Sequence, residues 1–314
     1  MNFLTNLGLL INATLIATPP LLFAALGSCF SERSGVVNIG IEGMMTVGAF
    51  TGAVVGLYSG NGWFAFLCGG LAGALMATIH AIVCIQFHAD QTIAGTAINF
   101  LGTGLSIFIC KAMFDNSSDT PGMDPSSKLP KLFEGVFPAG SFGSNVLNVY
   151  SVAYLVFVLA AVCWFVFYKT KFGSHLRACG EHPAAAASVG IPVKKYRYIA
   201  VLVSGFLGGL AGGCLVLTET IQFTSNTING AGFIALAAVS FGRWKPAGIS
   251  LSSLLFGTAV AFSIYVVNIP SLRNLPTEFF NLLPYVITIL ALVAFSGKNY
   301  APLACGKPYD KGAS

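Results

Sequence analysis

YIAVLVSGFLGGLAGGCLVL, residues 198–217, is a run of twenty residues without a charged side chain, and it decides the class of fold. About 20 mostly apolar residues in a helix are enough to cross the hydrocarbon core of a bilayer. Five of the twenty residues are glycines, and small residues let membrane helices approach one another closely. The run therefore predicts a membrane-spanning helix that packs tightly against its neighbours.

The same pattern recurs along the rest of the chain. Six further apolar stretches are long enough to span a bilayer: about 4–29, 40–58, 63–87, 92–113, 148–168 and 247–267. A window at about 279–296 is slightly short for a span. Residues 230–242 are apolar but too short to cross, so we predict a re-entrant or broken helix at 230–242. A helix of this kind is tolerated at membrane depth only where protein or a water-filled cavity surrounds it.

Composition supports this interpretation. The chain has 314 residues, of which 55% are hydrophobic and 9% charged, against about 25% charged residues in soluble domains. The apolar run from Leu4 to Cys29 lacks a preceding basic region and is too long for a cleaved signal peptide, so it predicts a retained first span. We expect residues 1–314 to form a single all-α, polytopic membrane domain with about eight transmembrane helices plus one short broken helix.

Two hydrophilic connections set the orientation. Residues 115–147 are rich in Asp, Ser, Pro, Gly and Asn and predict an external loop. Residues 169–197 carry six Lys and Arg against the single acid Glu181, and cytoplasmic loops collect basic residues. Alternation then places the N-terminus outside, the C-terminus inside, and 12 of the 16 Lys and Arg on the cytoplasmic side.

The sequence lacks the motifs that are typical of several classes of protein. The sequence has no G-x-x-x-x-G-K-[ST] phosphate loop, so any ATP and Mg²⁺ would be held by another polypeptide, and no cofactor is expected in this chain. The eight cysteines form no C-x-x-C pair and the four histidines show no ligand spacing, so neither a metal site nor a catalytic set is predicted. The basic loops explain the net charge of +5, which implies no nucleic-acid partner.

The first polar constellation is FSERSGVVNIGIEGMM, residues 30–45. It places Asn38 and Glu42 at the edge of a span, and Glu42 lies within an otherwise apolar run. An ionised side chain at membrane depth normally faces a cavity or a partner. The alternative is that Glu42 lies at the interface and favours the start of its own helix.

The second constellation, RACGEHPAAAASVGI at residues 177–191, lies in the basic loop. Pro183 suits the first turn of a helix, and the four alanines that follow favour helix. Gly190 followed by Pro192 ends it. The result is a short helix whose small side chains offer a docking surface, or else a simple connector.

Two further polar groups are candidates for the substrate pathway. Residues 218–223, with Asn226 and Asn229, offer amide and hydroxyl groups plus an aromatic ring near the outer face, which a site for a sugar-bearing base would need. Glu219, Gln222 and Phe223 are the candidate residues of this group. The alternative is an ordinary external loop. Thr92, Thr96, Asn99 and Thr103 form one stripe on the span at 92–113, which either lines a pathway or hydrogen-bonds to a neighbouring helix.

These motifs resemble those of a known family. The sequence resembles bacterial nucleoside ABC-transporter permeases, which belong to the wider ribose and branched-chain amino-acid permease family. The similar segments are residues 30–45, 177–191, Gly232 to Pro246, Leu283-Pro284-Tyr285 and the ending at 303–309. The resemblance covers nearly the whole chain except the loop 115–147. In size and motif order the chain looks like the smaller permease of the pair that such importers use.

The resemblance implies a function and a set of partners. It implies a bacterial cytoplasmic-membrane permease with the ABC importer permease fold. Such a permease works with a second homologous permease, a cytoplasmic ABC ATPase and an extracytoplasmic substrate-binding protein, often a lipoprotein. It also implies that the basic loop carries the coupling helix that docks on the ATPase, through Gly180, Glu181, His182, Pro183, Ala184, Ala185, Ala186 and Gly190.

Three alternatives stay open at this point. A simple-sugar, ribose-like ABC permease would share the same motifs. A stand-alone secondary transporter would need an intramembrane ion-coupling cluster, for which only Glu42 and Glu219 are available. A membrane enzyme would need a paired acid and base or a metal constellation, and the sequence offers neither.

Overall fold

The described part of the chain is mostly helical. The computed structural model describes residues 3–138, 141–266, 280, 282–295 and 300–310. Seven of the described helices are long and apolar enough to cross a membrane. They are α1 (Phe3–Arg33), α2 (Ile41–Ser59), α3 (Gly62–Ala81) with the π-helical turn η1 (Ile82–Gln86), α4 (Gln91–Met113), α6 (Ser151–Lys169), α9 (Val193–Leu215) with the π-helical turn η3 (Val216–Thr220), and α11 (Pro246–Val266).

These helices confirm the seven full-length spans expected from hydropathy. Polar side chains cap the starts of two of these helices. Asn61 accepts from the backbone of α3, and Asp90 accepts from Thr92 N and Ile93 N at the start of α4. Each cap satisfies backbone N–H groups that have no partner within the helix. The predicted window 279–296 lies partly outside the described residues, which show α13 (Leu283–Phe295) within it.

The centre of the bundle is α9, which packs against α1, α2 and α3. This contact depends on glycine. A Cβ added at Gly209 would overlap the backbone oxygen of Gly69 on α3, and one at Gly212 would overlap the backbone oxygen of Met45 on α2. The helices are therefore close enough for backbone to touch backbone, as small residues permit in membranes.

The short helix α10 (Ala231–Phe241) confirms the prediction that residues 230–242 do not cross the bilayer. It has 11 residues and follows Gly230, whose φ of 82° only glycine adopts readily. It packs against α1, α2, α11 and α13. Protein therefore packs on several sides of α10, and a cavity borders its start, which is the setting in which a short helix is stable at membrane depth.

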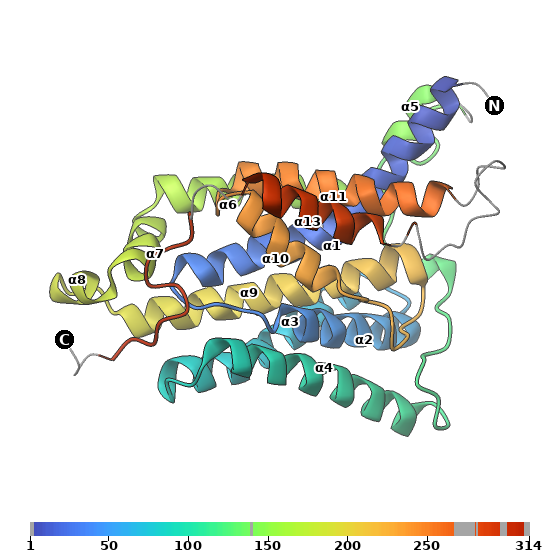
Figure 1. Cartoon of the computed structure of the whole chain (residues 1–314). Helices are drawn as coiled ribbons and strands as arrows, with labels where there is room; N and C mark the ends of the chain where they lie inside the picture. The colour runs from blue at the N-terminus through green and yellow to red at the C-terminus, as the bar shows by residue number, and fades with distance from the viewer. Residues whose placement is uncertain (1–2, 139–140, 267–279, 281, 296–299, 311–314) are drawn as a thin grey trace.

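The two hydrophilic connections lie at opposite ends of the bundle (Figure 1). The connection 115–147 contains the short turn η2 (Pro125–Ser127) and α5 (Phe142–Leu147), and α5 lies beside the first turns of α1. The basic connection contains α8 (Pro183–Ser188), as expected, and also α7 (Lys171–Glu181), which the sequence analysis did not predict. Thr170 caps α7 by accepting from Gly173 N at 3.1 Å.

A segment near the C-terminus, residues 300–310, binds back onto the α7–α8 end of the bundle (Figure 1). Ala304 N donates to Gly180 O of α7 at 2.9 Å, and Gly306 N donates to Gly35 O, in the turn after α1, at 3.2 Å. The guanidinium of Arg197 donates to Lys307 O at 3.1 Å. This segment therefore ties α7 to the ends of α1 and α9.

Candidate functional site: a cavity beside a broken helix

Glu42 lies at the start of α2 and binds the start of α10. Its Oε1 accepts from Gly230 N at 2.7 Å, and its Oε2 accepts from Gly232 N at 2.7 Å. The first N–H groups of a helix have no partner within the helix and carry the positive end of its dipole, so a carboxylate is well placed there. Glu42 lies in the first turn of its own helix α2, as one interpretation expects. It also pairs with a neighbouring helix, through backbone N–H groups rather than a charged side chain.

Glycine is required on the α10 side of this contact. A Cβ added at Gly232 would lie 2.6 Å from Glu42 Oε2. Glu42, from the motif at residues 30–45, and the glycines at the start of α10 thus form one structural contact, although 190 residues separate Glu42 from Gly232.

Asn99 joins the same region from α4. Its Oδ1 accepts from Gly43 N at 2.8 Å, and its Nδ2 donates to Ile39 O at 3.0 Å. Thr92 and Thr96 on the same helix are exposed, and Thr96 Oγ1 donates to Thr92 O within α4. Within this polar stripe, Asn99 therefore hydrogen-bonds to a neighbouring helix, which is one of the two roles that the sequence suggested for the stripe.

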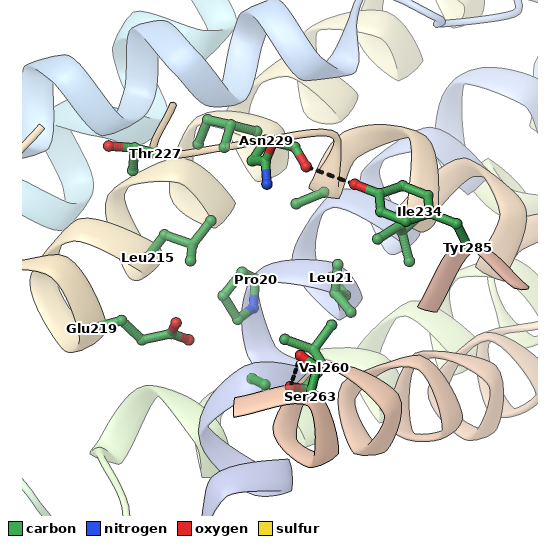
Figure 2. A pocket seen from close by; sticks show the side chains of 13 residues that line it. Pro20, Leu21, Leu215, Glu219, Thr227, Asn229, Ile234, Val260, Ser263 and Tyr285 are labelled. Carbon is green, nitrogen blue, oxygen red and sulfur yellow. Dashed lines mark hydrogen bonds between the residues drawn. The ribbon is translucent and has the colours of Figure 1, made fainter. Parts of the chain in front are cut away.

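A cavity of about 230 Å³ lies next to the start of α10 (Figure 2). The polar residues that line it come from four segments: Glu219 of η3, Thr227 and Asn229 between η3 and α10, Ser263 of α11 and Tyr285 of α13. The apolar walls come from α1, α9, α10, α11 and the residue before Asn229: Ala17, Pro20, Leu21, Leu215, Ile228, Ala231, Ile234 and Val260. Two of the wall residues are in or next to the Pro19-Pro20 pair inside α1, where proline removes helical hydrogen bonds.

Only some of the candidate pathway residues predicted from the sequence line this cavity. Glu219 lines it, whereas Gln222 is exposed. Phe223 is fully buried and packs its ring edge-on against Phe50, with 5.4 Å between the ring centroids. Asn38 is also buried and donates to Ser204 Oγ at 2.8 Å, which links the turn after α1 to α9.

Sequence reasoning missed several cavity residues. Tyr285 was noted only as part of a family motif, and Ser263 is a lone hydroxyl in an apolar span with no pattern around it. In the structure the Tyr285 hydroxyl donates to Asn229 O at 3.0 Å (Figure 2). The start of α10 is therefore held from two sides, by Glu42 of α2 and by Tyr285 of α13.

The α7–α8 end presents small side chains to its surroundings. Ala184, Ala185 and Gly190 are exposed, whereas Ala186 is buried in a small cluster with Cys179 and Val193. Glu181 Oε2 accepts from Leu303 N at 3.3 Å. Gly180 allows close contact with the end of α1, since an added Cβ would overlap Arg33 O.

Short or discontinuous helices beside a polar cavity occur in many membrane transporters. Over residues 10–292 the chain matches the family described as the permease component of the branched-chain amino acid transport system, and it belongs to that family. It is 42% identical to the guanosine ABC transporter permease protein NupQ of Bacillus subtilis, and the match covers 99% of each chain.

Two further proteins are similar over most of their length. The nucleoside ABC transporter permease protein NupC of Lactococcus lactis is 36% identical, with 99% of each chain covered. A solved structure described as an inward-facing conformation of a metal-chelate type ABC transporter superposes with a TM-score of 0.53 at 12% identity, over 91% of this chain and 85% of that one. The second likeness supports the fold alone: this chain has the fold of an ABC-transporter membrane subunit.

Proposed function

We propose that this chain is one permease subunit of an ATP-driven importer for nucleosides in the bacterial cytoplasmic membrane. The observation that carries the proposal is the full-length similarity to permeases named for guanosine and nucleosides. A cavity lined by apolar walls and a few polar groups is the kind of site that small ligands occupy. The same complex would include a second permease, a cytoplasmic ATPase that holds ATP and Mg²⁺, and an extracytoplasmic binding protein.

The test is transport by the complex reconstituted in proteoliposomes. We expect labelled guanosine and uridine to accumulate only with ATP and Mg²⁺, and unlabelled ribose to compete poorly. Uptake of ribose in preference to nucleosides would support the simple-sugar alternative. Uptake driven by an ion gradient without ATP would contradict the ABC proposal.

The orientation is tested by labelling in sealed cells. We expect an impermeant maleimide added outside to react with Ser126→Cys and not with Ser188→Cys, because both positions are exposed but the second lies in the basic loop. The native Cys179 in that loop will contribute little, since burial raises the pKa of its thiol to about 11. The wild-type chain is the background control. Labelling of Ser188→Cys from outside would reverse the orientation.

We also propose that α7 and α8 form the element that docks on the ATPase. We expect Ala185→Trp to reduce ATPase co-purification and ATP-dependent uptake by about tenfold or more, because a large side chain on this exposed small-residue surface prevents close approach. Ala186→Trp should instead lower the thermal stability of the subunit, since Ala186 is buried.

The matched control for that substitution is Ser126→Trp, which adds the same bulk at an exposed position in the opposite loop. It should leave both readouts unchanged. If Ala185→Trp retains full association and transport, α8 is a connector rather than a docking element.

A further inference from the structure

The polar groups of the cavity are mostly hydrogen-bond acceptors. The Ser263 hydroxyl donates its hydrogen to Val260 O at 2.7 Å, and the Tyr285 hydroxyl donates to Asn229 O at 3.0 Å (Figure 2). Their oxygens keep lone pairs for a ligand but have no hydrogen left to give. Thr227 Oγ1 already accepts from Thr224 N at 2.7 Å and contacts the Thr224 hydroxyl. The Asn229 amide supplies the main donor of the described lining.

Glu219 adds the strongest acceptor. Its side chain points into the cavity in Figure 2, and within the described part of the chain no hydrogen bond or ion pair is formed by its carboxylate. A carboxylate has two acceptor oxygens, and leaving it without a partner in apolar surroundings is costly. A ligand that brings hydrogen-bond donors and no negative charge would therefore gain most at this position.

The arrangement of the acceptors narrows the ligand further. They come from η3, α11 and α13, so they surround the space rather than line one wall (Figure 2). A ribose ring carries hydroxyl groups that point in different directions, whereas the donors of a nucleobase lie along one planar edge. The apolar side chains of Pro20, Leu21 and Ile234 can cover the carbon face of a sugar ring between these acceptors.

We propose that this cavity binds the ribose of a neutral nucleoside, with Glu219 accepting hydrogen bonds from two neighbouring sugar hydroxyls. This inference rests on the proposed function and adds the part of the substrate that is recognised. It follows that the permease tolerates different bases, requires the 2′-hydroxyl and excludes nucleotides, because a phosphate would lie near a carboxylate among oxygens that offer it few donors.

The experiment compares uridine with 2′-deoxyuridine in the reconstituted complex, with the same ATPase and binding protein throughout. A hydrogen bond to a charged group contributes about 1.5–3 kcal/mol, so we expect the wild type to prefer uridine in kcat/KM by about tenfold or more. In Glu219→Gln, which keeps the shape but removes the charge, the preference should fall to about threefold or less. The ATPase and the binding protein are the same in both complexes. A difference between the uridine to 2′-deoxyuridine ratios of the wild type and Glu219→Gln is therefore caused by the change in the cavity.

One control variant and one further test variant keep the experiment decisive. Glu134→Gln removes an acid in the exposed external loop and should preserve the wild-type ratio. Ser263→Ala removes a second acceptor around the sugar and should lower kcat/KM for uridine, so the proposal remains testable if Glu219→Gln fails to assemble. Uridine monophosphate should not compete with uridine in the wild type.

The outcomes separate the inference from the proposed function. If the wild-type complex transports nucleosides but Glu219→Gln keeps the wild-type ratio and Ser263→Ala keeps the wild-type kcat/KM for uridine, the ribose assignment is wrong and the proposed function stands. A selective loss of guanosine uptake with uridine unaffected would assign Glu219 to the base and overturn the inference. A requirement for Na⁺ that disappears in Glu219→Gln would assign Glu219 to a cation. Failure of the wild type to transport any nucleoside would overturn both.

Discussion

Replacing Glu42 by alanine is expected to reduce ATP-dependent uptake by more than tenfold while the complex still assembles. The substitution removes the acceptor for Gly230 N and Gly232 N at the start of α10. An unsatisfied buried donor costs about 1–3 kcal/mol, and the start of α10 would move to find other partners. Since α10 contributes to the cavity wall, the geometry of the site should change with it. The measurement is uptake by proteoliposomes containing the purified complex.

Two comparisons separate this effect from a general loss of charge. Glu42→Gln keeps one acceptor oxygen, so we expect uptake between those of the wild type and the alanine variant. Glu134→Ala removes an exposed acid from the external loop and should have no effect. Wild-type uptake by Glu42→Ala would show that the contact with α10 is dispensable for transport.

The second large effect is expected at the glycine contact between α9 and α3. Gly209→Leu should prevent stable assembly of the subunit, because even a Cβ at this position would overlap the backbone oxygen of Gly69. Overpacking a core typically costs about 1–3 kcal/mol, and here backbone rather than a flexible side chain must move. We expect the variant to be inserted but to elute as aggregate in detergent, or to melt at least about 10 °C below the wild type.

Gly104→Leu is the matched control for that substitution. Gly104 lies on the exposed side of α4, and a Cβ added there would meet no atom within 4 Å. This variant should elute and melt as the wild type does. Equal stability of the two leucine variants would mean that α3 and α9 are farther apart than described.

Hydropathy was sufficient for most of the fold but not for the site. Spans such as α4 could be predicted because a bilayer demands a continuous apolar run, and α10 because its run is too short to cross. Helix α7 was missed because its sequence, KFGSHLRACGE, is polar and carries two glycines. Its stability comes from packing against α1, α6 and α9. The buried residues Gly173, Leu176, Cys179 and Gly180 lie on one face at helical spacing, a pattern that hydropathy alone does not reveal.

The candidate site depends on contacts between residues far apart in the sequence. Glu42 could be singled out because a charge in an apolar run is costly, but its partners Gly230 and Gly232 are backbone groups that any sequence carries. Ser263 and Tyr285 reach the cavity only because α11 and α13 pack beside α10. The acid was therefore predictable, whereas the set of groups around it was not.

The contact between residues 300–310 and α7 also has a consequence for biosynthesis. Leu303 N donates to Glu181 Oε2, and the two residues are 122 positions apart in the chain. At a synthesis rate of about 5–20 residues per second, α7 leaves the ribosome roughly 6–24 s before the segment that holds it. The α7–α8 end therefore acquires its final hydrogen bonds only after α13 has been made. A nascent chain that is still being translated would present an incomplete surface at this end, so assembly with a partner there would have to wait for the completed membrane domain.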